Sequence, residues 1–138
     1  MLAYHGTNRI SAAEIIGPPT NIDVTMGGGE LGRGFYVGES VALAAAFSRG
    51  KYNLNGVVLK FDIDDHSFVQ LNIRTLNRRE QVYQHWRHML RRRQTNQFLY
   101  NVDVVTAPFS TIDFSLQHKF ESLASQDTLN NHSVIQLL

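Results

Sequence analysis

Residues 32–47 read GRGFYVGESVALAAAF, and this stretch decides the fold that we expect. The two glycines bend the chain before a short apolar strand over 35–37, and Ser40 can cap a helix over 41–47. The alanines of that helix permit close packing. Tyr36 lies on the strand, where an aromatic ring offers a flat face to a planar heterocycle.

A second informative stretch lies at the N-terminus, where a short apolar run over 2–4 is followed by His5, Gly6 and Thr7. The histidine ring can donate or accept a hydrogen bond, and glycine lets a ligand approach the backbone. Alone, either stretch is more often structural, as a satisfied histidine or a Gly-x-Gly turn. Together they predict a pocket for NAD.

The remaining pattern mixes strands and helices. Alternation over 57–64 predicts a strand with one buried face. Apolar residues at helical spacing predict an amphipathic helix over 78–93 that packs on the core. These residues are Val82, Trp86, Met89 and Leu90. We therefore expect an α+β fold with a largely antiparallel sheet.

Weaker signals fill in the rest of the chain. A capping box over 11–14 predicts a short helix that ends at 17–19, and the glycine-rich segment 21–33 predicts a mobile loop over a site. The last three predicted elements are a strand over 101–105 ended by Pro108, a short helix over 116–123 and a terminal strand over 133–138.

Composition predicts one globular domain over 1–138. The chain is 43% apolar and 18% charged, and it has no cysteine, which excludes a disulfide framework and thiolate chemistry. It has no apolar run near the ~20 residues of a membrane span and no signal-peptide pattern. We expect a cytoplasmic protein, or one delivered into a target cell without a leader, and no membrane partner.

Two clusters of basic residues lie in the helix predicted over 78–93. His85 and His88 are three positions apart and could share a metal, but no third ligand fits, so we expect no metal site. Arg87 and the arginines of 91–93 could contact nucleic-acid phosphates or an acidic protein. The simpler interpretation of both clusters is a solvated helix face.

The order His-Gly-Thr, gap, Gly-Arg-Gly-Phe-Tyr, helix, strand resembles the ADP-ribosyltransferase superfamily, in its branch of diphtheria-toxin-like and poly(ADP-ribose)-polymerase-like proteins. The segments 77–93 and 103–108 are similar to a bacterial subgroup of unknown function. The resemblance covers most of the chain, and its specific motifs lie in the first fifty residues. It implies split antiparallel sheets with short helices around an NAD cleft.

Position by position, the resemblance assigns NAD contacts to this chain. His5 would bond a ribose hydroxyl, the Gly6 backbone would hold the nicotinamide amide, and Thr7 would support that turn. Tyr36 and Phe47 would enclose the nicotinamide ring. Ala44 stands where relatives have a serine that bonds the amide. Arg33, beside Gly34, could meet the pyrophosphate or be a solvated loop cation.

The family's catalytic glutamate or glutamine has no obvious counterpart. At the start of the final strand the matching position is His132, which can act as a base but supplies no fixed negative charge. If the register differs, Asn131 or Gln136 could face the site, and Glu121 is a distant fallback. His132 could also simply cap a strand.

The resemblance implies a mono-ADP-ribosyltransferase, such as a toxin or effector, that uses NAD as substrate. Its acceptor would be a protein or nucleic acid, and a neutralising partner protein could accompany it. The alternatives are a module that binds NAD or ADP-ribose without transfer, and an NAD glycohydrolase that uses water as acceptor.

Overall fold

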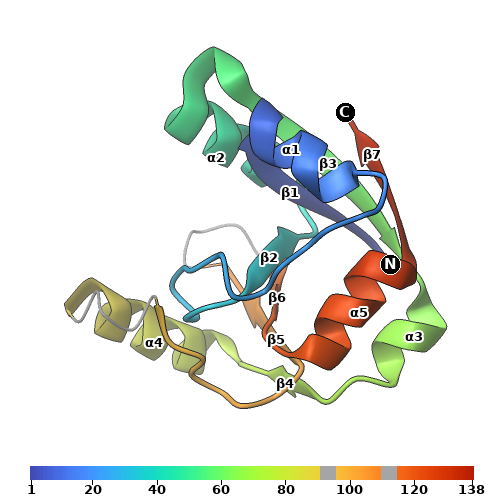
Figure 1. The fold of residues 1–138 in the computed structure, drawn as a ribbon. Helices are drawn as coiled ribbons and strands as arrows, with labels where there is room; N and C mark the ends of the chain where they lie inside the picture. The colour runs from blue at the N-terminus through green and yellow to red at the C-terminus, as the bar shows by residue number, and fades with distance from the viewer. Residues whose placement is uncertain (91–95, 110–114) are drawn as a thin grey trace.

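The computed structural model describes residues 1–90, 96–109 and 115–138. In these residues the fold is α+β: seven strands form one mostly antiparallel sheet, and five α-helices pack around it (Figure 1). The strands are β1 (Leu2–Asn8), β2 (Phe35–Gly38), β3 (Gly56–Ile63), β4 (Ile73–Thr75), β5 (Val104–Pro108), β6 (Leu116–Phe120) and β7 (Ser133–Leu137). The helices are α1 (Arg9–Ile16), α2 (Val41–Tyr52), α3 (Asp65–Val69), α4 (Arg78–Leu90) and α5 (Leu123–Asn131), with a 3-10 turn η1 (Asn53–Asn55).

The sheet divides between β1 and β2. Its strand order is β4-β5-β6-β2-β1-β3-β7, and β1 pairs with β3 along its whole length. Between β1 and β2, by contrast, the pairing in the described chain is confined to Tyr4 opposite Gly38. The two strand groups diverge from this junction, as Figure 1 shows. Both sequence motifs lie on the strands that meet there.

The two faces of the sheet are covered by different helices. Ala12 of α1 and Leu129 of α5 share the larger core cluster with Phe61 of β3, so α1 and α5 cover one face, called here the α1 face. Strand alternation puts Gly6 on the opposite face, where the α2 backbone lies against it. We call this the α2 face, and α4 also covers it. In the described residues no helix is long and apolar enough to cross a bilayer.

The strongest sequence signals are confirmed. The strand over 35–37 is β2, and Ser40 caps α2 by accepting a hydrogen bond from the Leu43 backbone N–H at 3.2 Å. The alternation over 57–64 corresponds to β3, whose inward side chains are all in the core. The terminal strand is β7, and the segment 21–33 contains no helix or named strand.

Several local predictions are wrong. The segment predicted as a helix over 116–123 begins with strand β6, and helix α5 follows it. Helix α1 begins two residues before Ser11, because the Asn8 side chain is the cap that accepts from the Ser11 N–H at 2.8 Å. The strand predicted over 101–105 starts at Val104 and includes Pro108. In the N-terminal motif, Gly6 and Thr7 belong to a strand and not to a turn.

The helix predicted over 78–93 is confirmed as α4, but the face that it buries is not the one predicted. The side chains that it buries are Gln81 and Gln84, while the apolar residues that defined the sequence pattern are exposed. Val82, Trp86, Met89 and Leu90 are between 39% and 80% exposed. The basic residues 91–93 lie outside the described residues. The helix therefore packs through a polar face.

Candidate functional site

His5 joins the two halves of the sheet where their backbone pairing ends. Its ring nitrogen Nδ1 lies 2.6 Å from the backbone oxygen of Tyr36, and the ring stacks on Phe35 with 4.3 Å between centroids. Because a carbonyl oxygen only accepts, Nδ1 carries the proton in this bond. In the neutral ring Nε2 is then an acceptor, suited to a hydroxyl donor. Burial lowers the pKa of His5, which favours this neutral form.

The backbone of Gly6 points away from β3, toward the side of β1 where the pairing with β2 has ended. Gly6 lies opposite Val58, whose carbonyl accepts from the Leu138 N–H at 3.0 Å on the other side of β3. The N–H and C=O of one strand residue point to the same side, so Val58 does not bond Gly6. Both Gly6 groups therefore point away from β3, to the side where β2 has left β1. They offer one donor and one acceptor side by side.

Helix α2 explains why position 6 is a glycine. A β-carbon at Gly6 would lie 2.4 Å from the Ala44 carbonyl oxygen and 3.3 Å from Cδ1 of Phe47. The group that approaches the glycine from the face of the sheet is therefore the helix itself. The same packing brings Phe47, whose side chain remains 55% exposed, next to the N-terminal motif. Thus Gly6, Ala44 and Phe47 come together in the structure, and their contact with NAD stays a prediction.

Tyr36 is held by the glycine-rich segment before it. Its hydroxyl accepts from the Leu31 N–H at 3.1 Å and donates to the Gly32 carbonyl. A β-carbon at Gly29 would lie 2.8 Å from Cζ of the ring, so the segment passes close over the ring. Burial is the main cause that raises the pKa of Tyr36, and the hydroxyl stays protonated. The ring is connected to His5 through the Tyr36 backbone; its stacking on nicotinamide stays a prediction.

Three other predicted residues are fixed by packing. Thr7 is buried in β1, and a β-carbon at Gly34 would collide with Cδ of Lys119 at 2.4 Å. Arg33 lies over the Phe98 ring, with Cζ 5.9 Å from the ring centroid. Its buried Nε has no hydrogen-bond partner among the described residues. A pyrophosphate contact for Arg33 therefore stays a prediction.

His132 lies away from this cluster. It caps the end of α5, half-exposed, with Nε2 3.9 Å from Asp127. Through β3, His5 is level with Leu137 of β7, five positions beyond His132, which corresponds to about 17 Å along the strand. Gln136 is closer, because it pairs with Lys60, which pairs with Tyr4 on the α2 face. Asn131 ends α5 and bonds Asp127.

The structure adds a polar cluster that the sequence pattern does not reveal. The Glu30 carboxylate receives hydrogen bonds from the side chains of Gln81 and Gln117 and lies 3.0 Å from Nδ1 of His85. The Gln84 side chain donates to the Glu30 carbonyl. This cluster attaches the glycine-rich segment to α4 and β6. In this cluster the His85 ring has a structural partner, Glu30. Glu30 in turn attaches the segment that precedes Tyr36 to two other elements, α4 and β6.

Two more buried polar groups lie in β6. Lys119, opposite Tyr36 in the sheet, donates to Oε1 of Glu121 at 2.8 Å, and both side chains are almost fully buried. On the α1 face, His118 links the buried Thr106 hydroxyl at 2.8 Å to Glu39 at 3.1 Å. Gln117, Lys119 and Glu121 recur at every second position, which is the spacing of one face of a strand. This spacing is the sequence signal that could have predicted β6.

Comparison of the chain with models of known protein families gives no match, and comparison with curated protein sequences gives none either.

Proposed function

We propose that this chain binds NAD at the junction of β1 and β2 and transfers its ADP-ribose to a macromolecular acceptor. The observation that carries the proposal is the orientation of Gly6. Its N–H and C=O point together away from β3, on the side of β1 where the pairing with β2 has ended. A primary carboxamide such as that of nicotinamide presents one acceptor and two donors, and it is complementary to this pair.

The groups around Gly6 support the same ligand. His5 holds the Nδ1 proton on the Tyr36 carbonyl, which leaves Nε2 to accept from a ribose hydroxyl. The exposed ring of Phe47 lies next to Gly6 and supplies an aromatic wall for a flat heterocycle. In this proposal Phe47 and Tyr36 flank the nicotinamide, as the resemblance to ADP-ribosyltransferases implies.

The transfer itself is a glycosyl transfer. The bond between C1′ of the ribose and the nicotinamide nitrogen breaks with its electron pair going to the ring. The acceptor nucleophile forms the new bond to C1′ and loses a proton. Positive charge develops on the ribose in the transition state. Holding the leaving ring on Gly6 and the ribose on His5 would orient the substrate for this step.

A second function, NAD binding without efficient transfer, is favoured by the position of His132. This residue is half-exposed and lies about 17 Å along the sheet from the level of His5. Gln136, the alternative that lies on β7 one position from the level of His5, is uncharged. Without a carboxylate beside the ribose, less of the developing charge is stabilised, so turnover would be slow. Hydrolysis of NAD to free ADP-ribose is the remaining alternative.

The decisive measurement is nicotinamide release from labelled NAD. Phe47→Ala removes an exposed ring, so folding should be little affected, and the KM for NAD should rise about ten-fold, which corresponds to ~1.4 kcal/mol. The matched control is Leu54→Ala, a 93% exposed residue after α2, which should leave KM unchanged. His5→Ala should reduce kcat/KM for NAD by more than Phe47→Ala does.

The distribution of the label separates the alternatives. Label on protein or nucleic acid indicates transfer, and release without such label indicates hydrolysis. NAD binding by calorimetry without release would favour the binding module. If the wild-type chain neither binds NAD nor releases nicotinamide, the proposal is wrong in all three forms.

A further inference from the structure

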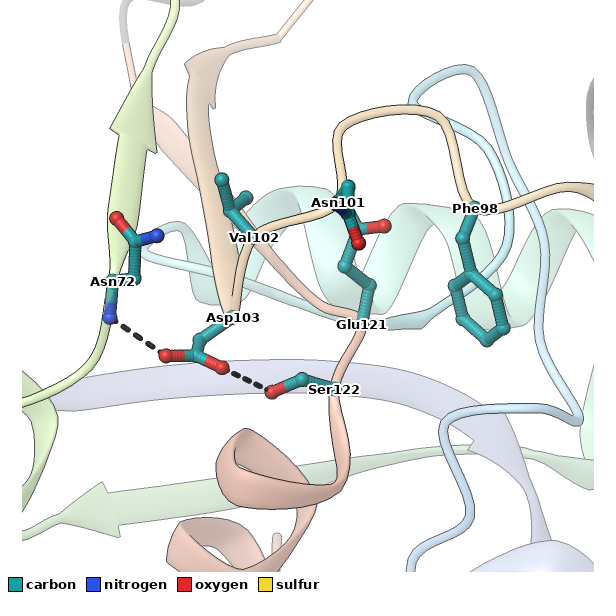
Figure 2. A pocket seen from close by; sticks show the side chains of 7 residues that line it. All are labelled: Asn72, Phe98, Asn101, Val102, Asp103, Glu121 and Ser122. Carbon is teal, nitrogen blue, oxygen red and sulfur yellow. Dashed lines mark hydrogen bonds between the residues drawn. The ribbon is translucent and has the colours of Figure 1, made fainter.

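A second site candidate is a cavity of about 260 Å³ at the end of β6. Its walls come from the turn before β4, the segment before β5 and the start of α5, as Figure 2 shows. The lining residues are Asn72, Phe98, Asn101, Val102, Asp103, Glu121 and Ser122. A cavity of this size is small for a dinucleotide but larger than a single water molecule needs. It suits a ligand of a few heavy atoms.

Glu121, which lines this cavity, has an unsatisfied carboxylate oxygen. Its side chain is 1% exposed and its Oε1 accepts from Lys119, whereas Oε2 has no hydrogen-bond partner among the described residues. Figure 2 shows the side chain extending from β6 toward Asn101. A buried carboxylate oxygen without a donor is costly, because its hydration is lost and not replaced. A ligand with N–H donors would replace that hydration.

The charge of the lining favours a cation. The seven side chains include two carboxylates and no cationic group. Lys119 compensates the Glu121 carboxylate, whereas Asp103 has no ion-pair partner among the described residues. Asp103 is held in place, because its two oxygens accept from the Asn72 N–H at 2.7 Å and the Ser122 hydroxyl at 2.6 Å. A negative concave surface attracts small cations.

We infer that this cavity binds a guanidinium group, of a small free ligand or of an arginine side chain. A planar guanidinium has five N–H donors, which can serve Oε2 of Glu121 and the neighbouring amide oxygens of Asn72 or Asn101 together. Its face can also lie against an aromatic ring, and Phe98, whose ring carries the Arg33 guanidinium with Cζ 5.9 Å from the centroid, lines the cavity. The inference does not depend on NAD, since none of these residues belongs to the β1 and β2 junction.

The test is a titration of the isotope-labelled protein with methylguanidinium chloride, followed by backbone amide NMR at constant ionic strength. We expect saturable shifts confined to 98–103 and 121–122, with a Kd in the millimolar range. Tetramethylammonium chloride, a cation without N–H donors, should bind at least ten-fold more weakly. Non-saturating shifts, or equal affinity for the two cations, would show that only non-specific charge attraction operates.

Two variants localise the binding. Val102→Phe fills the cavity and leaves the Lys119 and Glu121 residues themselves unchanged, so it should abolish the saturable shifts, while Leu54→Phe on the exposed surface is its matched control. If Val102→Phe does not fold, Phe98→Leu, at a 44% exposed position, should weaken binding several-fold. Binding that survives in a folded Val102→Phe protein and in Phe98→Leu would overturn the inference.

A further arm of the titration identifies the source of the group. A glycine peptide with one central arginine that binds as tightly as methylguanidinium indicates a side chain of a protein partner. A peptide that binds at least ten-fold more weakly indicates a small free ligand. Both results support a guanidinium site, and absence of binding by both probes overturns it.

Discussion

At the residue scale, the ion pair of Lys119 and Glu121 is the most demanding feature of the molecule. The two side chains are 0% and 1% exposed, and Lys119 Nζ also lies 5.3 Å from the centroid of the Tyr100 ring. Burial lowers the pKa of Lys119, while its hydrogen bond to Glu121 opposes this shift. Such a pair is weak evidence for stability, yet removing one member leaves a buried charge without compensation.

We therefore expect Lys119→Met to lower the free energy of unfolding by about 3–5 kcal/mol, because it leaves the Glu121 carboxylate buried and unpaired. The double variant Lys119→Met with Glu121→Gln removes both charges and should recover most of that loss. Urea denaturation of the two variants measures the difference. Lys51→Met, on the exposed end of α2, should change stability by no more than about 0.5 kcal/mol. A double variant as unstable as the single one would contradict this account.

At the element scale, α4 is held by hydrogen bonds where its sequence predicts apolar packing. Periodicity identified the helix correctly but selected the wrong face, since Gln81 is fully buried and Trp86 is 61% exposed. The inward face is set by Glu30, 51 positions before Gln81 in the chain. A partly buried carboxylate favours nearby donors, and the helix face that carries them turns inward. Such a distant partner leaves no periodic signal in the sequence.

Substitutions on the two faces of α4 should have different effects on the free energy of unfolding. Gln81→Ala removes a side chain that donates to Glu30 at 3.1 Å and should cost about 1.5–3 kcal/mol, the usual range for a hydrogen bond to a charged group. Trp86→Ala should change stability by only about 0.5 kcal/mol. Chemical denaturation measures both. A loss of about 3–5 kcal/mol for Trp86→Ala, the cost of emptying a core site, would instead support the face predicted from the apolar pattern.

Elsewhere, the sequence predictions are accurate where the structure depends on neighbouring residues and inaccurate where it depends on residues far away in the chain. Strand β3 and the start of α2 were predicted because alternation and a serine cap are local signals. Strand β6 was mistaken for a helix because three of its four buried residues, Gln117, His118 and Lys119, are polar, and their burial depends on partners in other elements. Within the candidate site, the two motifs that meet at His5 were found from residue type. The position of His132 could not be predicted from residue type, because it depends on the register of β7 with β3.

At the scale of the whole molecule, one histidine connects the two halves of the sheet, and a second connects strands within the half that contains β2. His5 connects β1 to the Tyr36 carbonyl, and His118 connects β6 to Glu39 and thus to the residue after β2. Burial lowers the pKa of both rings below the ordinary value of about 6.5. Each ring therefore favours its neutral form in the folded state.

This pKa difference predicts acid sensitivity. Below about pH 6.5 the unfolded chain takes up protons at these two histidines that the folded chain does not bind, so the free energy of unfolding should fall as pH falls. Each histidine contributes a slope of up to about 1.4 kcal/mol per pH unit until its folded pKa is reached. Urea midpoints at pH 7, 6 and 5 measure the decline. His118→Gln should reduce the slope, whereas His66→Gln, on the exposed surface of α3, should not; equal slopes in the wild type and His118→Gln would exclude His118 as a cause.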